Sequence, residues 1–343
     1  MILKGFEVLQ EFLSSPKNIV IIGHRNPDGD AIGSTLALHF YLKKKKHRTR
    51  VLVPNDFPEF LKWLPQSDKI LRFDKQNAQS MNALMKSDLV FLLDFNALHR
   101  VGSDMGSTLA QYSNDFALID HHLQPDDFKY MYSDTSISST CQMVYQFIEM
   151  NNDLDLIDER IATCLYTGIM TDTGSFRFRS TTSRTHRILA DLIDKGAVNH
   201  RIHNNVYDAN SYGRLSLLGR ALNNLYILQE FSTAFIVISQ QDKDECNFEK
   251  GDTEGVVNYA LSAKDVVFAA IFIEDIEQKI VKISFRSKGT FSVNEFARNY
   301  FDGGGHTNAA GGRSEVSLEE TVTRFKSLLP NYKTQLLESY NEN

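Results

Sequence analysis

Four segments of the 343-residue chain place aspartate or histidine directly after an apolar run. From the N-terminus, they are His24-Arg25-Asn26-Pro27-Asp28-Gly29-Asp30, Asp94, Asp120-His121-His122 and Asp172-Thr173-Gly174. Carboxylates gathered in one cleft repel one another and lose hydration, so they need a compensating cation. Carboxylate and imidazole ligands together suit Mn²⁺ and related ions, whereas Mg²⁺ usually takes oxygen ligands alone. If the segments converge, they predict a site for a pair of divalent cations.

The first segment has an informative spacing. Asp28 and Asp30 lie two residues apart around Gly29, so a tight turn can direct them toward two neighbouring ions. Ordinary structural explanations also exist. Asp30 could cap a helix that begins at Ala31, and a single histidine such as His24 is more often structural. The occurrence of all four segments, in this order, favours the metal site.

Alternating strands and helices are expected to position these residues. Apolar runs predict buried strands at 18–22, 50–53, 89–93 and 116–119. The spacing of Ile32, Leu36 and Phe40 predicts a helix, and two amphipathic stretches over 140–150 and 159–170 predict two more. This alternation indicates a mainly parallel sheet with helices on both faces. Three of the four segments would then lie at the carboxyl ends of strands, where ligand sites form, and the fourth joins them if its helix ends there.

The chain is longer than one core usually organises, so two domains are expected. We predict an α/β fold with a catalytic metal-binding domain over 1–200, a helical connector over 201–228 and a smaller α/β substrate-binding domain over 229–343. In the last region, strand-like runs at 234–239, 266–273 and 279–286 precede a glycine-dense turn, Gly303-Gly304-Gly305-His306.

Composition excludes several classes of protein. Hydrophobic residues make up 42% and charged residues 23%, which is typical of folded soluble domains and not of disordered or collagen-like chains. The net charge of −6 disfavours bulk duplex-DNA binding. The three cysteines form no CxxC pair, so neither a disulfide framework nor a cysteine zinc site is supported. Neither a signal peptide nor a membrane-length apolar segment is recognisable, and we expect a cytoplasmic protein.

On these residues the chain resembles the DHH phosphoesterase superfamily, which is named for the triplet Asp120-His121-His122. The resemblance extends to the His24–Asp30 segment, Asp94, Thr171-Asp172-Thr173-Gly174, Arg286-Ser287 and Gly303-Gly304-Gly305-His306, the last two being similar to the DHH-associated C-terminal domain. It is strongest to bacterial oligoribonuclease/pAp-phosphatase enzymes and weaker to single-strand DNA exonucleases, exopolyphosphatases and family II inorganic pyrophosphatases. Arg25 departs from the Thr or Glu of many relatives, which bears only on substrate detail.

The resemblance implies a set of metal ligands and catalytic residues. One Mn²⁺ would be held by His24, Asp28, Asp94 and Asp172, and the second by Asp30, Asp94 and His121, with Mg²⁺ or Co²⁺ as substitutes. His122 would face the scissile phosphate, either stabilising its charge or protonating the leaving group. Asp120 would orient a ligand histidine.

The resemblance also implies a substrate and its contacts. The reaction would be hydrolysis of short oligoribonucleotides (nanoRNA) and of 3'-phosphoadenosine 5'-phosphate (pAp), with water activated by two metal ions. Arg286, Ser287, Gly303, Gly304, Gly305 and His306 would bind a substrate phosphate. The partner is thus a short single-stranded RNA or a small nucleotide, and a homodimer is left open. Two alternatives remain, namely a phosphoanhydride hydrolase acting on polyphosphate or pyrophosphate and a non-catalytic nucleotide sensor.

Some chemistry-bearing residues fall outside this scheme. The run Lys43–Lys46 could contact nucleic acid but is more typical of a solvated helix end. Arg177 and Arg179 could line a cleft, whereas His186 and His203 have no partners at ligand spacing.

Overall fold

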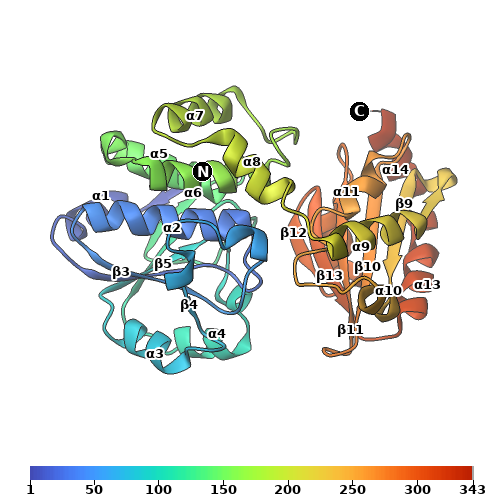
Figure 1. Ribbon diagram of the computed structural model, residues 1–343, viewed down its shortest axis with the longest axis horizontal. Coiled ribbons are helices and arrows are strands. Elements are labelled where there is room, and N and C mark those ends of the chain that lie inside the picture. The colour runs from blue at the N-terminus through green and yellow to red at the C-terminus, as the bar shows by residue number, and fades with distance from the viewer. Residues whose placement is uncertain (342–343) are drawn as a thin grey trace. The chain divides into compact units, whose positions relative to one another are not determined.

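The computed structural model describes residues 1–341 and divides into two compact units, Met1–Ala209 and the chain from Asn210 onward (Figure 1). The division falls inside the stretch 201–228 that was expected to be a helical connector. There, α8 (Asn199–Tyr207) belongs to the first unit, whereas α9 (Tyr212–Asn223) and the strand β8 (Leu225–Leu228) belong to the second. The predicted fold class is confirmed, since both units are α/β and the N-terminal sheet is mainly parallel. The last two residues of the predicted range 229–343 lie outside the described residues.

The first unit is built on a seven-stranded sheet with the order β1-β7-β6-β5-β2-β3-β4. Its strands are β1 (Ile2–Lys4), β2 (Asn18–Ile22), β3 (Arg48–Val53), β4 (Leu71–Arg72), β5 (Leu89–Leu93), β6 (Asp115–Asp120) and β7 (Tyr130–Ser133). All neighbouring strands run parallel except β1, which is antiparallel to β7. The four predicted strands are therefore confirmed as β2, β3, β5 and β6.

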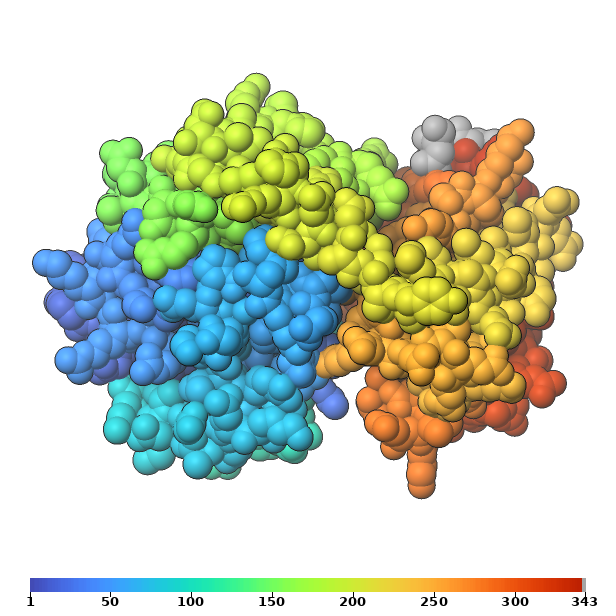
Figure 2. Space-filling model, viewed as in Figure 1, coloured from blue at the N-terminus to red at the C-terminus, as the bar shows by residue number. Residues whose placement is uncertain are grey.

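Helices cover both faces of this sheet (Figure 1). They are α1 (Phe6–Phe12), α2 (Gly29–Lys44), α3 (Asn77–Met85), α4 (Ser103–Leu109), α5 (Thr140–Met150), α6 (Glu159–Asp172), α7 (Ser183–Asp194) and α8. Because side chains alternate along a strand, Ile19 and Ile21 of β2 pack with α2, α5 and α6, whereas Val20 and Ile22 pack with α3 and α4. In the space-filling view, the green to yellow-green surface of α5 to α8 forms one continuous layer (Figure 2).

Glycines allow α2, α5 and α6 to approach one another closely. A Cβ atom on Gly33 of α2 would lie 2.5 Å from the carbonyl oxygen of Cys164 on α6. A Cβ atom on Gly168 of α6 would collide with Sγ of Cys141 and lie 2.8 Å from Oδ1 of Asp30. Since Asp30 lies on α2 and α6 ends at Asp172, this packing sets where two of the predicted ligands lie.

The second unit contains a six-stranded sheet with the order β12-β13-β11-β10-β9-β8. Besides β8, its strands are β9 (Thr233–Ile238), β10 (Phe268–Asp275), β11 (Ile280–Ser287), β12 (Gly304–His306) and β13 (Ala309–Ser314), and only the β9–β10 pair is parallel. Its helices are α9, α10 (Gln240–Glu245), α11 (Val257–Ser262), α12 (Val293–Tyr300), α13 (Leu318–Leu328) and α14 (Lys333–Asn341). The three predicted strands correspond to β9, β10 and β11. Phe268, Phe285, Phe296 and Phe325 dominate the larger of its two cores.

Short 3₁₀ helices complete the connections of both units. They span Glu59–Leu61, Ser67–Lys69, Leu98–Val101, Leu154–Leu156, Gln229–Phe231 and Leu329–Tyr332. Among residues 1–341, the helices are all too short or too polar to cross a membrane.

The glycine-dense turn predicted at 303–306 is wrong. Residues 304–306 form the strand β12, which pairs with β13, and the turn lies at Thr307 and Asn308. The glycines serve close packing between backbones, because a Cβ atom on Gly303 would collide with the carbonyl oxygen of Gly311. A Cβ atom on Gly305 would likewise collide with the carbonyl oxygen of Ala309.

The packing of α6 gives a prediction for stability. Gly168→Ala should lower the free energy of unfolding by about 1–3 kcal/mol, because the added methyl group has no room. Gly219→Ala is the matched control, since a Cβ atom there meets nothing within 4 Å inside α9, and it should stabilise by about 0.5–1 kcal/mol. Urea-induced unfolding followed by circular dichroism measures both. Equal stability of Gly168→Ala and the wild type would contradict the close packing.

Candidate metal centre

The carboxyl ends of β2, β5 and β6 bring three of the four predicted segments together. The strand order reverses here, because the chain continues from β2 to β3 on one side while β5 lies on the other. Such a reversal opens a crevice at the ends of parallel strands. Asp94 directly follows β5, and His121 directly follows β6. The fourth residue, Asp172, is the last residue of α6.

Asp94 lies at the centre of the cluster. Its Oδ2 is 3.5 Å from Nε2 of His24, and its Oδ1 is 3.4 Å from Nε2 of His121. The residue is buried and has a φ of 66°, in the left-handed region that non-glycine residues rarely adopt. Backbone strain of this kind is concentrated at functional sites, where the surrounding structure holds it in place.

Three overlapping groups have ligand atoms that all lie within 4.8 Å of one another. They are His24 with Asp28 and Asp94, Asp30 with Asp94 and His121, and Asp94 with Asp120 and His122. Oδ2 of Asp172 lies 3.5 Å from Nε2 of His121, so this carboxylate lies at the edge of the same cluster. The structure therefore brings together all six residues that were predicted as metal ligands. Their carboxylate and imidazole atoms form a donor set that fits divalent transition-metal ions.

Backbone carbonyl groups orient the two central histidines. Nδ1 of His24 lies 2.9 Å from the carbonyl oxygen of Arg25, and Nδ1 of His121 lies 3.1 Å from that of Ile137. Because a carbonyl oxygen only accepts hydrogen bonds, each Nδ1 must carry the proton. The Nε2 atom then faces the carboxylates, which is the arrangement found in metal-binding histidines.

Helix N-termini hold the two aspartates of the first segment. Oδ1 of Asp28 accepts hydrogen bonds from the backbone N–H groups of Asp30 (3.0 Å) and Ala31 (3.1 Å). Asp28 is thus the cap of α2, and the alternative in which Asp30 caps a helix beginning at Ala31 is wrong. Asp30 instead lies against the start of α5, where its carboxylate accepts from the N–H groups of Thr140 (2.5 Å) and Cys141 (2.8 Å). The positive end of α5 favours this buried negative charge.

Thr140 is a positioning residue that the sequence analysis missed. Its Oγ1 donates a hydrogen bond to Oδ1 of Asp94 (3.0 Å), while its backbone N–H binds Asp30. One residue therefore fixes two carboxylates that are far from it in the chain. The sequence offers only a weak signal, a Ser139-Thr140 pair at the start of an amphipathic helix.

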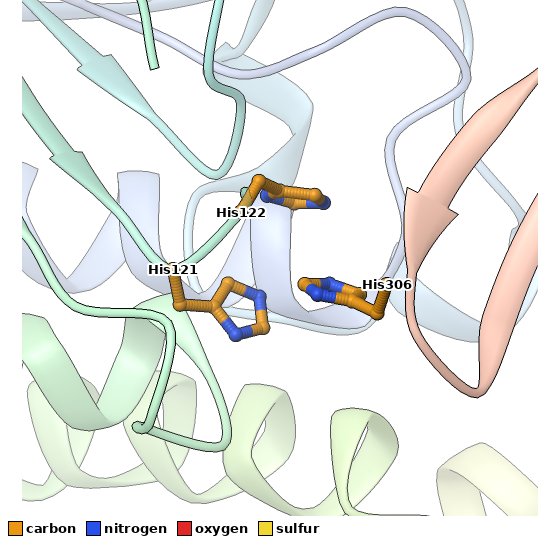
Figure 3. A group of neighbouring side chains, drawn as sticks. All are labelled: His121, His122 and His306. Carbon is orange, nitrogen blue, oxygen red and sulfur yellow. The ribbon is translucent and has the colours of Figure 1, made fainter. Parts of the chain in front are cut away.

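Asp120 holds His122 through two contacts. Oδ1 of Asp120 lies 2.7 Å from Nδ1 of His122, and Oδ2 accepts the backbone N–H of the same residue at 3.0 Å. Figure 3 shows the rings of His121 and His122 extending from the segment after β6. Asp120 is fully buried, so its orientation and that of His122 are fixed together.

The cluster concentrates negative charge in a buried space. Burial, together with the charges of Asp94 and Asp172, raises the pKa of Asp30 well above its usual value. Burial also raises the pKa of Asp172 to about 7, although His121 opposes this. For His24, burial is outweighed by Asp28 and Asp94, which raise its pKa to about 10. Protons or metal cations are thus required to neutralise the carboxylates.

The residues predicted to bind substrate lie on β11 and β12 of the second unit, except Gly303, which directly precedes β12. Nη1 of Arg286 on β11 donates to the carbonyl oxygen of Phe285 (2.9 Å). Oγ of Ser287 donates to the carbonyl oxygen of Phe291 (2.6 Å) and accepts from Nδ2 of Asn308 (2.9 Å), so Ser287 fixes neighbouring loops. His306 extends from the end of β12 (Figure 3).

The side chain of Asn294 on α12 forms a hydrogen bond with one of the backbone N–H groups that were expected to face a phosphate. Its Oδ1 accepts the N–H of Gly305 (3.0 Å) and also Nε of Arg298 (3.2 Å). Arg298 is an exposed cation beside Gly304, and the sequence analysis did not single it out. Its position depends on α12 packing against the β12–β13 hairpin, which no local motif reveals.

Comparisons with known proteins agree with this architecture. The model of the DHH family, N-terminal domain, matches residues 18–169, and the DHHA1 domain model matches residues 233–332. The crystal structure of an exopolyphosphatase-related protein from Bacteroides fragilis is 38% identical and superposes with a TM-score of 0.91, over 96% of this chain and 97% of that one. The chain belongs to the DHH family.

Curated DHH relatives match most of the chain. It is 29% identical to the probable bifunctional oligoribonuclease and PAP phosphatase NrnA of Streptococcus mutans, over 94% of this chain and 98% of the relative. It is also 29% identical to the bifunctional oligoribonuclease and PAP phosphatase NrnA of Thermus thermophilus, over 85% of this chain and 83% of the relative. The predicted resemblance to this subgroup of the DHH superfamily is thereby confirmed.

The hydrogen bond between Thr140 and Asp94 gives a prediction for metal binding in this DHH protein. Thr140→Val should weaken Mn²⁺ binding by about 10–100-fold, because it removes a contact that orients a shared carboxylate. Isothermal titration calorimetry of EDTA-treated protein measures the affinity. Thr167→Val is the control, since that hydroxyl group donates within α6 to the carbonyl oxygen of Thr163. If both variants bind Mn²⁺ alike, Thr140 has no positioning role.

Proposed function

We propose that this protein is a Mn²⁺-dependent phosphoesterase that hydrolyses short oligoribonucleotides and pAp. The observation that carries the proposal is the buried Asp94, whose carboxylate belongs to each of the overlapping ligand groups. A shared carboxylate suits two neighbouring divalent ions. The names of the Streptococcus and Thermus relatives, which are oligoribonucleases and PAP phosphatases, support the choice of substrate.

The ligands divide between two ions. We assign His24, Asp28, Asp94 and Asp172 to the first Mn²⁺, and Asp30, Asp94 and His121 to the second. Such a pair would supply a water of lowered pKa and neutralise charge on the phosphate. Mn²⁺ suits the mixture of oxygen and nitrogen donors, with Mg²⁺ or Co²⁺ as substitutes. The carbonyl groups of Arg25 and Ile137 orient His24 and His121 so that Nε2 is the donor atom.

His122 acts on the substrate, and Asp120 positions it. Because Nδ1 of His122 is paired with Asp120, the proton that His122 exchanges with the substrate is carried by Nε2. His122 then donates either a hydrogen bond to a charged phosphate oxygen or a proton to the leaving oxygen. The carboxylate of Asp120 stabilises the positively charged form of the ring in both cases.

The second unit supplies substrate recognition. Since the N–H of Gly305 is paired with Asn294, we assign the phosphate contacts mainly to the side chains of Arg286 and His306. Arg298 adds a second guanidinium group, next to Gly304. The guanidinium group of an arginine can bind a phosphate with two hydrogen bonds. Ser287 and Gly303 contribute indirectly, because their contacts fix the neighbouring backbone.

Phosphoanhydride hydrolysis is a second candidate. The Bacteroides fragilis protein is described as exopolyphosphatase-related. A metal pair can activate water for attack on an ester or on an anhydride, so the recognition residues decide between them.

Hydrolysis assays with a panel of substrates test the proposal. With Mn²⁺, the wild type should release mononucleotides from di- to pentaribonucleotides and phosphate from pAp, faster than it degrades polyphosphate. Asp94→Asn should lower these rates by about a thousandfold, because it disrupts both ion sites. Asp104→Asn, on the exposed surface of α4, is the matched control and should retain activity. Turnover of polyphosphate alone would favour the second candidate, and turnover of no substrate would favour a sensor.

Substitution of Asp120 tests whether this residue positions His122 or binds a metal ion. Asp120→Asn should lower kcat by about a hundredfold, because the amide cannot stabilise a protonated His122. The Mn²⁺ affinity should stay within error of the wild type, and KM should change little. Steady-state kinetics with calorimetry measure the three quantities. An equal loss in Mn²⁺ affinity would instead place Asp120 among the metal ligands.

A further inference from the structure

A cavity of about 360 Å³ lies in the first unit, among α2, β3 and residues 66–71. It contains none of the residues of the metal cluster. His39 on its wall is nine residues after Asp30 on α2, which corresponds to about 14 Å along a helix at 1.5 Å per residue. The volume is within the range of small-molecule sites, which is roughly 300–1,000 Å³.

The charged groups that line this cavity are all basic. They are Lys43, Arg50 and Lys69. Lys69 pairs with Asp68 at 2.7 Å. Among residues 1–341, no carboxylate lies within ion-pair distance of Lys43 or Arg50, and Arg50 donates only to the carbonyl oxygen of Thr49 (3.3 Å).

Lys43 differs in this respect from the next two lysines of its run. Lys44 pairs with Asp158 at 3.0 Å, and Lys45 pairs with Asp153 at 2.9 Å. Two members of the run are thus neutralised by the protein itself, while Lys43, which is exposed, lines a cavity whose lining residues include no acidic group. All four lysines are exposed at the end of α2, as expected of a solvated helix end, and only Lys43 also lines the cavity.

The buried imidazole ring of His39 forms a further part of the cavity wall. The side chain of His39 is almost fully buried, and its Nδ1 lies 2.8 Å from Oγ1 of Thr49. Burial, with the neighbouring charge of Lys43, lowers the pKa of His39 to about 4, so the ring is neutral at physiological pH. Leu36 and Ile70 add apolar surface beside it.

We propose that this cavity binds a small organic phosphate of the size of a nucleoside monophosphate. The phosphate would lie between Lys43 and Arg50, and the organic part would lie against Leu36 and Ile70. Arginine can hold a phosphate with two hydrogen bonds, and lysine adds a compact positive charge. The negative end of α2 opposes an anion with only about half a charge, which the full charges of Lys43 and Arg50 outweigh.

Calorimetry with the full-length chain in EDTA tests this site while suppressing metal-dependent phosphate binding. The probes are AMP, inorganic phosphate and adenosine. AMP should bind about tenfold more tightly than either fragment, since only AMP uses both the cations and the apolar wall. Equal affinities for AMP and adenosine would refute the proposed phosphate contact. Equal affinities for AMP and inorganic phosphate would refute the proposed contact with the organic part of the ligand.

Matched substitutions locate the binding. Lys43→Gln and Arg50→Gln should each weaken AMP binding by about tenfold. Lys46→Gln removes the same charge from the same run, but this residue does not line the cavity, so the affinity should be unchanged. AMP affinities of Lys43→Gln and Arg50→Gln that equal that of Lys46→Gln would refute the proposal.

Discussion

The buried negative charge of Asp94 is the constraint on which the rest of the first unit depends. A carboxylate in this position is unstable unless hydrogen bonds and positive charge compensate for the lost hydration. His24 and His121 approach it from two different strand ends, and Thr140 donates a hydrogen bond to it. The left-handed backbone conformation of Asp94 adds conformational strain, which persists only because the surrounding contacts hold the residue in place.

Folding and site assembly are consequently the same process in this unit. The N–H groups at the start of α5 bind Asp30, and Asp28 caps α2, so two of the proposed ligands are also structural contacts of helices. Gly33 and Gly168 permit the helix packing that brings these groups to one edge of the sheet. Because a methyl group added at Gly168 would also press against Asp30, stability and site geometry cannot be changed independently there.

The sequence predicts the central strands, and the candidate ligands that follow them, for one physical reason. Strands buried on both faces are continuous apolar runs, so 18–22 and 89–93 coincide with β2 and β5, and the polar residues that follow them stand out. Edge strands such as β1 and β4 are short or exposed and carry no such pattern. Thr140 and Asn294 were missed because their hydrogen-bond partners are distant in the chain. The glycines at 303–305 were assigned to a turn because glycine is favoured both in turns and where two backbones pack closely.

Charge distribution bears on the length of substrate that the protein can accept. The chain has a net charge of −6, so its overall charge does not attract a long polyanion. In the proposed function, attraction comes from the two metal ions and from the side chains of Arg286, Arg298 and His306. Each further phosphate of a longer strand would extend beyond these few groups and gain little from counterion release. The same balance that makes bulk nucleic-acid binding unfavourable therefore favours substrates of a few nucleotides.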